Sequence, residues 1–190
     1  MKKLLPLILV VVMILTFVSC GKDEPKKENT GKKVTLYGET TQEDGKALAV
    51  DFFYPENDDV TLDSKEEYIN CVDINYNSKN IAVSPAIFED TTFNENKEYA
   101  KENEETYKEF KINGYDCYGY EDFGGYWIYV HLEELSDTTN IYLVIETKLI
   151  DFTKDTPQGV AHYEDKDLKK IIESFEYHGL VDYPPAQEAK

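Results

Sequence analysis

The sequence predicts one α+β domain over residues 34–180, in which helices cover an antiparallel sheet to form an α/β/α sandwich. Short runs of alternating apolar residues are separated by Asp-Gly, Asn-Gly and Gly-Gly sequences, which is typical of strands joined in hairpins. Two segments with helical spacing of apolar residues interrupt these strands. The 15 Tyr, 9 Phe and one Trp supply apolar surface that a disordered acidic chain lacks, so we expect a folded core.

The charge of the chain excludes several classes of protein. All 20 basic residues are lysine and 38 residues are acidic, which gives a formal net charge of −18. Such a chain repels nucleic-acid phosphates and lacks the guanidinium groups that bind them in a bidentate way, so we expect no nucleic-acid partner. The sequence has one long apolar run, which excludes a multi-span membrane protein. It contains no Walker loop or dinucleotide-binding glycine pattern, and we expect no cofactor.

Residues 1–19 have the pattern of a secretory signal peptide, with two lysines followed by an apolar run from Leu4 to Val18. As a helix this run would span roughly 22 Å, less than the roughly 30 Å of a bilayer core, so a permanent spanning helix is the weaker interpretation. The sequence Phe17-Val18-Ser19-Cys20 is similar to a bacterial lipobox. That resemblance implies that Cys20 carries a lipid and becomes the mature N-terminus; the alternative is an ordinary buried thiol.

We therefore predict a bacterial lipoprotein, whose domain is held on the extracytoplasmic side of the cell membrane by the lipid on Cys20. Residues 20–33 should form a flexible tether, because they are polar and contain proline and glycine. Residues 181–190 contain a Pro-Pro pair and little to bury, so we expect a disordered tail. Bacterial surfaces are anionic, so the acidic domain should not lie flat against lipid headgroups.

The first half of the domain is predicted to form two hairpins. Residues 34–37 and 47–54 flank Asp44-Gly45, a sequence that adopts the positive φ values of a tight turn. Residues 68–76 and 81–83 flank a second turn at 77–80 in the same way. The residues expected on the buried face of the second strand are Leu48, Val50, Phe52 and Tyr54.

A helix is predicted from Phe93 to Lys111. The sequence Thr92-Phe93-Asn94-Glu95 has the spacing of a capping box, and the Lys, Glu and Ala content that follows favours a helix. Its narrow apolar stripe should lie on the surface of the sheet, with the charged residues facing water. The stripe consists of Phe93, Tyr99, Ala100, Tyr107 and Phe110.

The second half of the domain is predicted to contain three strands and a helix. Residues 115–121 and 126–132 follow glycine-containing turns, and residues 141–150 form the next strand. Asp165 should cap a helix, since the apolar residues behind it have the i, i+3, i+4, i+7 spacing. These residues are Leu168, Ile171, Ile172 and Phe175, and a short closing strand is expected at 175–177.

The order of these elements and several short sequences resemble the PsbP-like family of small bacterial lipoproteins and photosynthetic accessory proteins. The resemblance spans about residues 34–178. It implies a sheet sandwiched by helices and a binding or assembly role, with no catalytic residues to carry over. The sequences that carry it are Phe52-Phe53-Tyr54-Pro55, the helix after Ile81-Ala82-Val83, Ile112-Asn113-Gly114-Tyr115 and Ile171-Ile172-Glu173-Ser174-Phe175-Glu176-Tyr177.

Two cysteines, Cys71 and Cys117, remain if Cys20 is acylated. An even number of thiols outside the cytoplasm permits one disulfide, and the alternative is two independent buried thiols on strands. Cys117 and His131 could be considered as a catalytic nucleophile and its base, but no sequence motif supports this pair.

An unusual number of aromatic residues lies between Tyr115 and Tyr142. Strand alternation puts Trp127, Tyr129 and His131 on one face of the sheet and places their apolar neighbours, Tyr126, Ile128, Val130 and Leu132, in the core. The first face either packs beneath a helix or forms an open surface on which a sugar ring or a partner protein stacks. The candidate stacking residues are Trp127, Tyr129, Tyr118 and Tyr142.

No metal site is predicted. His131, His162 and His178 are scattered singly, which indicates structural or exposed histidines. The sequence Asp73-x-Asn75-x-Asn77 begins like a calcium loop, but serines replace the required glycine and glutamate, which excludes an EF-hand. A weak surface calcium site is the alternative to a solvated acidic loop at Asp58, Asp59, Asp63 and Glu66.

The leading functional hypothesis is a lipid-anchored binding or assembly module without catalysis, which has an unidentified protein or glycan partner. One alternative is a cell-surface carbohydrate-binding lipoprotein that uses Trp127 and Tyr129. The other is a carboxylate-dependent hydrolase, because the many acids make a pair at glycosidase spacing expected by chance.

Overall fold

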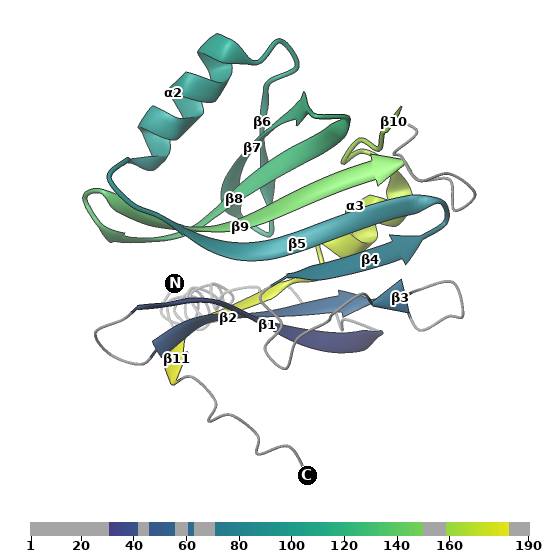
Figure 1. Cartoon of the computed structure of the whole chain (residues 1–190), viewed down its shortest axis with the longest axis horizontal. Coiled ribbons are helices and arrows are strands. Elements are labelled where there is room, and N and C mark those ends of the chain that lie inside the picture. The colour runs from purple at the N-terminus through teal and green to yellow at the C-terminus, as the bar shows by residue number, and fades with distance from the viewer. Residues whose placement is uncertain (1–30, 42–45, 56–60, 63–70, 150–158, 183–190) are drawn as a thin grey trace, which may run out of the picture.

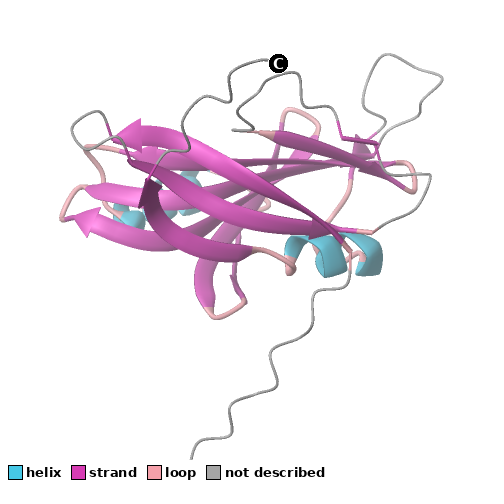
Figure 2. Ribbon diagram, turned by 90° about the horizontal axis from the view of Figure 1, so that it is seen from below, coloured by secondary structure: helices cyan, strands magenta, loops and turns pink. Residues whose placement is uncertain are grey.

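The computed structural model describes residues 31–41, 46–55, 61–62, 71–149 and 159–182. These residues form mostly strands, with two short helices beside them (Figure 2). The strands make two antiparallel sheets, which lie in separate layers (Figure 1). The prediction of an α+β sandwich covered by helices is therefore wrong, because a second sheet covers the main sheet where a helical layer was expected.

The larger sheet has eight strands and contains the turns that the sequence predicts. Seven strands lie in the order β3 (Thr61–Leu62), β4 (Val72–Tyr76), β5 (Lys79–Phe88), β9 (Thr139–Leu149), β8 (Gly125–Ser136), β7 (Tyr115–Asp122) and β6 (Lys108–Ile112), and β10 (Gly159–Val160) pairs with β9. Positive φ values at Asn77 and Ser78, at Asn113 and Gly114, and at Phe123 and Gly124 form the tight turns of three hairpins.

The smaller sheet joins the two ends of the domain. Its order is β1 (Lys32–Thr41), β2 (Lys46–Tyr54) and β11 (Glu176–Asp182), and both pairings are antiparallel. The first pairing confirms the predicted opening hairpin. The second extends the closing strand to Asp182, so residues 181 and 182 belong to the sheet and not to the expected tail.

The main core lies on one face of the larger sheet. The smaller sheet contributes Leu48, Val50 and Phe52, which have no exposed surface. Towards β6 and β7 the same face is covered by α3 (Lys166–Ile172) and the residues beside it, for example where the ring of Tyr163 stacks on Phe110 with centroids 4.9 Å apart. The smaller sheet and α3 therefore each cover part of this face of the larger sheet.

The other face of the larger sheet carries α2 (Phe93–Asn103), as Figure 1 shows. The capping box is confirmed, since the Thr92 side chain accepts from the backbone of Glu95 and the Glu95 side chain accepts from the backbone of Thr92. The helix ends eight residues before the predicted Lys111, because residues 108–112 pair with β7 across the Asn113-Gly114 turn. Strand pairing outweighs the helix propensity of this segment.

The early end of α2 changes which side chains it buries. Ala100 is buried and Phe93 packs on the sheet, as the predicted stripe requires. Tyr99, however, is 71% exposed, while Tyr107 and Phe110 lie beyond the helix. Phe93 is thus the main aromatic side chain through which the helix contacts the sheet.

Asp165 fastens α3 to the larger sheet, and its removal should weaken the fold. Its side chain accepts from the backbone N–H groups of Asp167 and Leu168, and one of its oxygens lies 3.0 Å from Lys79 Nζ on β5. We expect Asp165→Ala to lower the free energy of unfolding by about 1 kcal/mol at pH 7, the usual cost of a lost cap. Urea unfolding measures this difference, and Glu102→Ala on the exposed side of α2 is the control.

The same variant should show a defined pH dependence. Burial acts to raise the pKa of Asp165, but the hydrogen bonds from Lys79, Asp167 and Leu168 together hold it below its usual range. A lowered pKa in the folded state means that the stabilisation is complete above the ordinary aspartate value of about 3.9 and is lost as the pH falls below it. The difference between wild type and Asp165→Ala should therefore shrink towards pH 3. A difference that is constant from pH 7 to pH 3 would contradict this assignment.

Candidate functional site

Strand β8 separates its side chains between the two faces as its sequence predicts. Tyr126, Ile128, Val130 and Leu132 are buried in the main core, which confirms that face as core. The alternate residues lie on the α2 side and are half-buried. These are Trp127, Tyr129 and His131.

An aromatic cluster fills the space between α2 and the sheet. Tyr118 and Tyr129 stack with ring centroids 4.9 Å apart, and Phe88 packs on Tyr142 at 4.6 Å. Phe93 of α2 stacks on His131 at 4.4 Å with 11° between the rings. The cluster consists of Phe88, Phe93, Tyr107, Tyr118, Tyr120, Tyr129 and Tyr142.

The structure brings the four predicted stacking residues onto one face of the sheet, but they differ in their exposure to solvent. Tyr118 and Tyr142 are 3% and 0% exposed, so neither presents a ring to a ligand. Tyr129 is half-buried, and its hydroxyl lies 3.1 Å from that of Tyr120. Trp127 is also half-buried, and its indole N–H donates to the carbonyl of Asp122 at 3.1 Å. Burial beneath α2 thus leaves Trp127 and Tyr129 as the candidates from that set.

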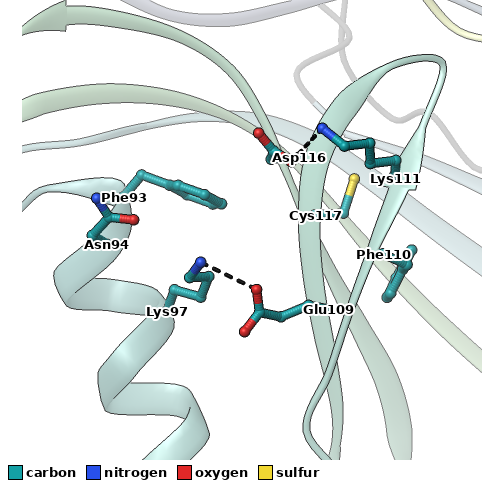
Figure 3. A pocket seen from close by; sticks show the side chains of 8 residues that line it. All are labelled: Phe93, Asn94, Lys97, Glu109, Phe110, Lys111, Asp116 and Cys117. Atoms are coloured by element: carbon teal, nitrogen blue, oxygen red, sulfur yellow. Dashed lines mark hydrogen bonds and ion pairs between the residues drawn. The ribbon is translucent and has the colours of Figure 1, made fainter.

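A pocket of about 420 Å³, the α2 pocket, lies between the start of α2 and the β6–β7 hairpin (Figure 3). Charged side chains of both signs reach into it from the helix and from the strands, beside the ring of Phe93. Its lining residues are Phe93, Asn94, Lys97, Glu109, Phe110, Lys111, Asp116 and Cys117. Sequence analysis missed this site because residues 108–111 were expected to continue the helix and not to form the opposite wall of the pocket.

Two ion pairs set the electrostatics of the α2 pocket. Lys97 Nζ lies 3.1 Å from Glu109 Oε2, and Lys111 Nζ lies 2.7 Å from Asp116 Oδ1. The hydrogen bond from Lys97 lowers the pKa of Glu109, and that from Lys111 lowers the pKa of Asp116. Both carboxylates are therefore ionised at neutral pH, and the pocket offers two cations and two anions.

The thiol of Cys117 does not behave as a catalytic nucleophile. Burial raises its pKa to about 12, so the thiolate is scarce at neutral pH. Cys117 pairs with Val130 across β7 and β8, and alternation turns His131 to the opposite face. His131 Nε2 instead lies 2.9 Å from the side-chain oxygen of Asn140. The structure keeps apart the two residues of the hypothetical nucleophile and base.

The disulfide that the sequence permits is not formed in the structure, where Cys71 and Cys117 are free thiols. Cys71 is exposed at the start of β4, whereas Cys117 is buried in β7. Three strands separate β4 from β7, which amounts to about 19 Å at the usual strand spacing. That separation exceeds the roughly 4.4–6.8 Å between Cα atoms that a disulfide spans.

Other candidate residues are placed as follows. His162 lies 3.5 Å from Glu121, and His178 lies 3.0 Å from Asp51. No helix in the described part of the chain is both long and apolar enough to cross a membrane. The predicted lipidation site Cys20 and the calcium candidates Asp58, Asp59, Asp63 and Glu66 lie outside the described residues.

Comparison with known proteins assigns no relative to this chain. No family model, no curated protein and no solved structure matches it. The resemblance to PsbP-like lipoproteins therefore stays a prediction from short sequences, and the functional argument depends on the site itself.

Proposed function

We propose that the protein is a lipid-anchored, extracytoplasmic binding module, and that the α2 pocket is its ligand site. The observation that carries the second statement is a pocket of about 420 Å³ in which paired charges lie beside the ring of Phe93. Small-ligand sites have volumes of roughly 300–1,000 Å³ and combine apolar surface with a few oriented polar groups. The anchor and the tether rest on the sequence of residues 1–33.

The charges of the α2 pocket favour a small zwitterion, such as an amino acid or a dipeptide. A ligand ammonium group would exchange places with a lysine beside Glu109 or Asp116, while a ligand carboxylate would bind Lys97 or Lys111. The charges in the pocket would then stay balanced, because each charged side chain would keep a partner of opposite sign. Lys97, only 22% exposed, should matter more than Lys111, which is 65% exposed and mostly solvated.

A ligand screen with a matched lysine control tests this proposal. The full-length protein in detergent is heated with each of the twenty free amino acids and with a set of dipeptides. A ligand at 100 times its Kd should stabilise the fold by about 2.7 kcal/mol, a readily measured shift in Tm. Lys97→Met should weaken binding about tenfold, because it removes a charged hydrogen bond.

The control is Lys101→Met, one turn along the same helix. Lys101 lies 3.4 Å from Glu98 in an exposed ion pair and does not line the pocket, so its loss should leave binding unchanged. If no compound raises the Tm, or if both lysine variants weaken binding equally, the α2 pocket is not a zwitterion site.

The anchor is tested separately by labelling with a palmitate analogue in bacteria that process lipoproteins. Wild type should incorporate the label and Cys20→Ser should not. Cys71→Ser, which removes an exposed thiol, should keep the label. Label retained in Cys20→Ser would refute lipidation at that residue, whatever the outcome of the ligand screen.

One observation favours glycan binding as a second candidate function. Trp127 is half-buried and its ring is held by the hydrogen bond to Asp122, opposite Tyr120 on the neighbouring strand. A rigid, partly accessible indole suits stacking on a sugar ring. Titration of the wild type with a glycan panel should then quench the fluorescence of its single tryptophan. In an affinity assay, Trp127→Phe should lose glycan binding. If no glycan changes the fluorescence of the wild type, this function is excluded.

A further inference from the structure

Side chains from two segments that are distant in the sequence meet on the smaller sheet. Asp51 lies on β2, and Glu176 lies directly opposite it on β11. His178, two residues farther along β11, has its Nε2 atom 3.0 Å from Asp51 Oδ2. One carboxylate or imidazole atom from each residue lies within 4.8 Å of the other two.

From this arrangement we infer that Asp51, Glu176 and His178 form a binding site for a divalent transition-metal ion. The inference is independent of the α2 pocket, which lies on the other side of the larger sheet. It makes metal binding a further property of this protein.

The two carboxylates of the cluster favour the binding of a cation. Two carboxylates directly opposite each other on paired strands repel unless a positive charge lies between them. The Asp51 side chain is also shielded from solvent, with 8% of it exposed. Its negative charge therefore needs a positive partner more than that of a solvated carboxylate does. A divalent ion would neutralise both carboxylates at once.

Lys33 supplies a positive charge beside Asp51 in the structure. Its Nζ atom lies 2.8 Å from Asp51 Oδ2, the same oxygen that faces His178, while Thr35 donates to the other oxygen at 2.7 Å. The Lys33 side chain is 53% exposed and extends from β1 at the edge of the sheet. It can therefore turn into solvent at little cost when a metal ion binds, and the two cations should compete.

The backbone of β11 is irregular at the ligand residues. The pairing with β2 shifts between Tyr177 and Leu180, so His178 and Gly179 oppose one residue of β2, and Gly179 has a φ of +75°. A β-bulge of this kind redirects side chains and is common beside functional sites. Glu176 and His178 are both exposed, so they can close around an ion.

The ligand set favours zinc over calcium or magnesium. One imidazole nitrogen and two carboxylate oxygens form a mixed set of the kind that binds Zn²⁺, with the fourth position left to water. Calcium and magnesium use oxygen ligands, and a histidine contributes nothing to their binding. The three ligand atoms lie within 4.8 Å of one another. They must approach one another more closely for each to form a bond of about 2.0–2.2 Å to Zn²⁺.

Calorimetric titration of Zn²⁺ into the metal-free, full-length protein in detergent tests this inference. His178→Ala should weaken zinc binding by at least the roughly 10–100-fold that the loss of a supporting residue costs. His162→Ala is the matched control, because His162 also lies beside a carboxylate, Glu121 at 3.5 Å, but outside the cluster. Lys33→Met should tighten zinc binding, since it removes the competing ammonium group.

The last variant makes the test decisive. Both His178 and Lys33 have exposed side chains, and circular dichroism shows whether each variant keeps the fold. Tighter binding in Lys33→Met together with weaker binding in His178→Ala supports the site. Zinc binding that is absent in both wild type and Lys33→Met, or that is equally weakened by His178→Ala and His162→Ala, overturns it. Calcium that binds as tightly as zinc also overturns it.

Discussion

Phe52→Ala is expected to destabilise the protein by about 4 kcal/mol, the largest effect of any substitution considered. Phe52 has no exposed surface and lies where the smaller sheet packs on the larger one. Truncation of a fully buried phenylalanine costs about 3–5 kcal/mol, because apolar contacts are lost and a cavity remains. Urea unfolding followed by circular dichroism measures the change in the free energy of unfolding.

Phe123→Ala is the control for this prediction, because Phe123 is 89% exposed at the β7–β8 turn. It should change the free energy of unfolding by about 0.5 kcal/mol or less. Similar losses in both variants would mean that the contact between the two sheets does not hold the domain together.

Phe93→Ala should destabilise the protein by about 2 kcal/mol and loosen α2 from the sheet. The side chain is half-buried and is enclosed by Tyr118, His131 and Tyr142, with ring centroids 6.0, 4.4 and 6.2 Å away. We expect about half of the cost of a fully buried phenylalanine. A loss of about 2 kcal/mol lowers the Tm by about 4–8 °C in a domain of this size.

Phe93→Ala should also loosen α2 locally, which amide hydrogen exchange can detect. Amide hydrogen exchange in α2 should speed up more than exchange in β8 or β9, because the helix loses its aromatic contact while the sheet keeps its pairing. Tyr99→Ala is the control on the same helix, since Tyr99 is 71% exposed and should leave both the Tm and the exchange unchanged. Uniform acceleration throughout the domain would show that α2 is not a separate unit.

Local sequence patterns predicted the β1–β2, β4–β5 and β7–β8 hairpins and both helix starts correctly. Turn dipeptides such as Asn113-Gly114 require positive φ values that few other residues adopt, and the structure has them at those positions. The caps at Thr92 and Asp165 depend on side chains and backbone groups within three residues of each other. Alternation along β8 identified the core face because it follows from strand geometry alone.

The same local patterns failed wherever a distant strand decided the outcome. Residues 108–111 have a helical composition, but the partner strand β7 draws them into the sheet. The sequence left open whether the face that carries Tyr118 and Tyr142 packs beneath a helix, and the packing of α2 buries both side chains. The fold class was wrong for a related reason: no local feature of residues 176–182 indicates that this segment pairs with β2 and completes a second sheet.

The sequence by itself determined the acidic composition, the hairpin turns and the caps, since each turn and cap depends on residues close together along the chain. The secretory leader stays a prediction from residues 1–19. Only the tertiary structure decided the two sites. The α2 pocket requires helix and hairpin to face each other, and the Asp51, Glu176 and His178 cluster requires β11 to return beside β2. Such contacts depend on which segments pair across long separations, and that choice is made by the packing of the whole core.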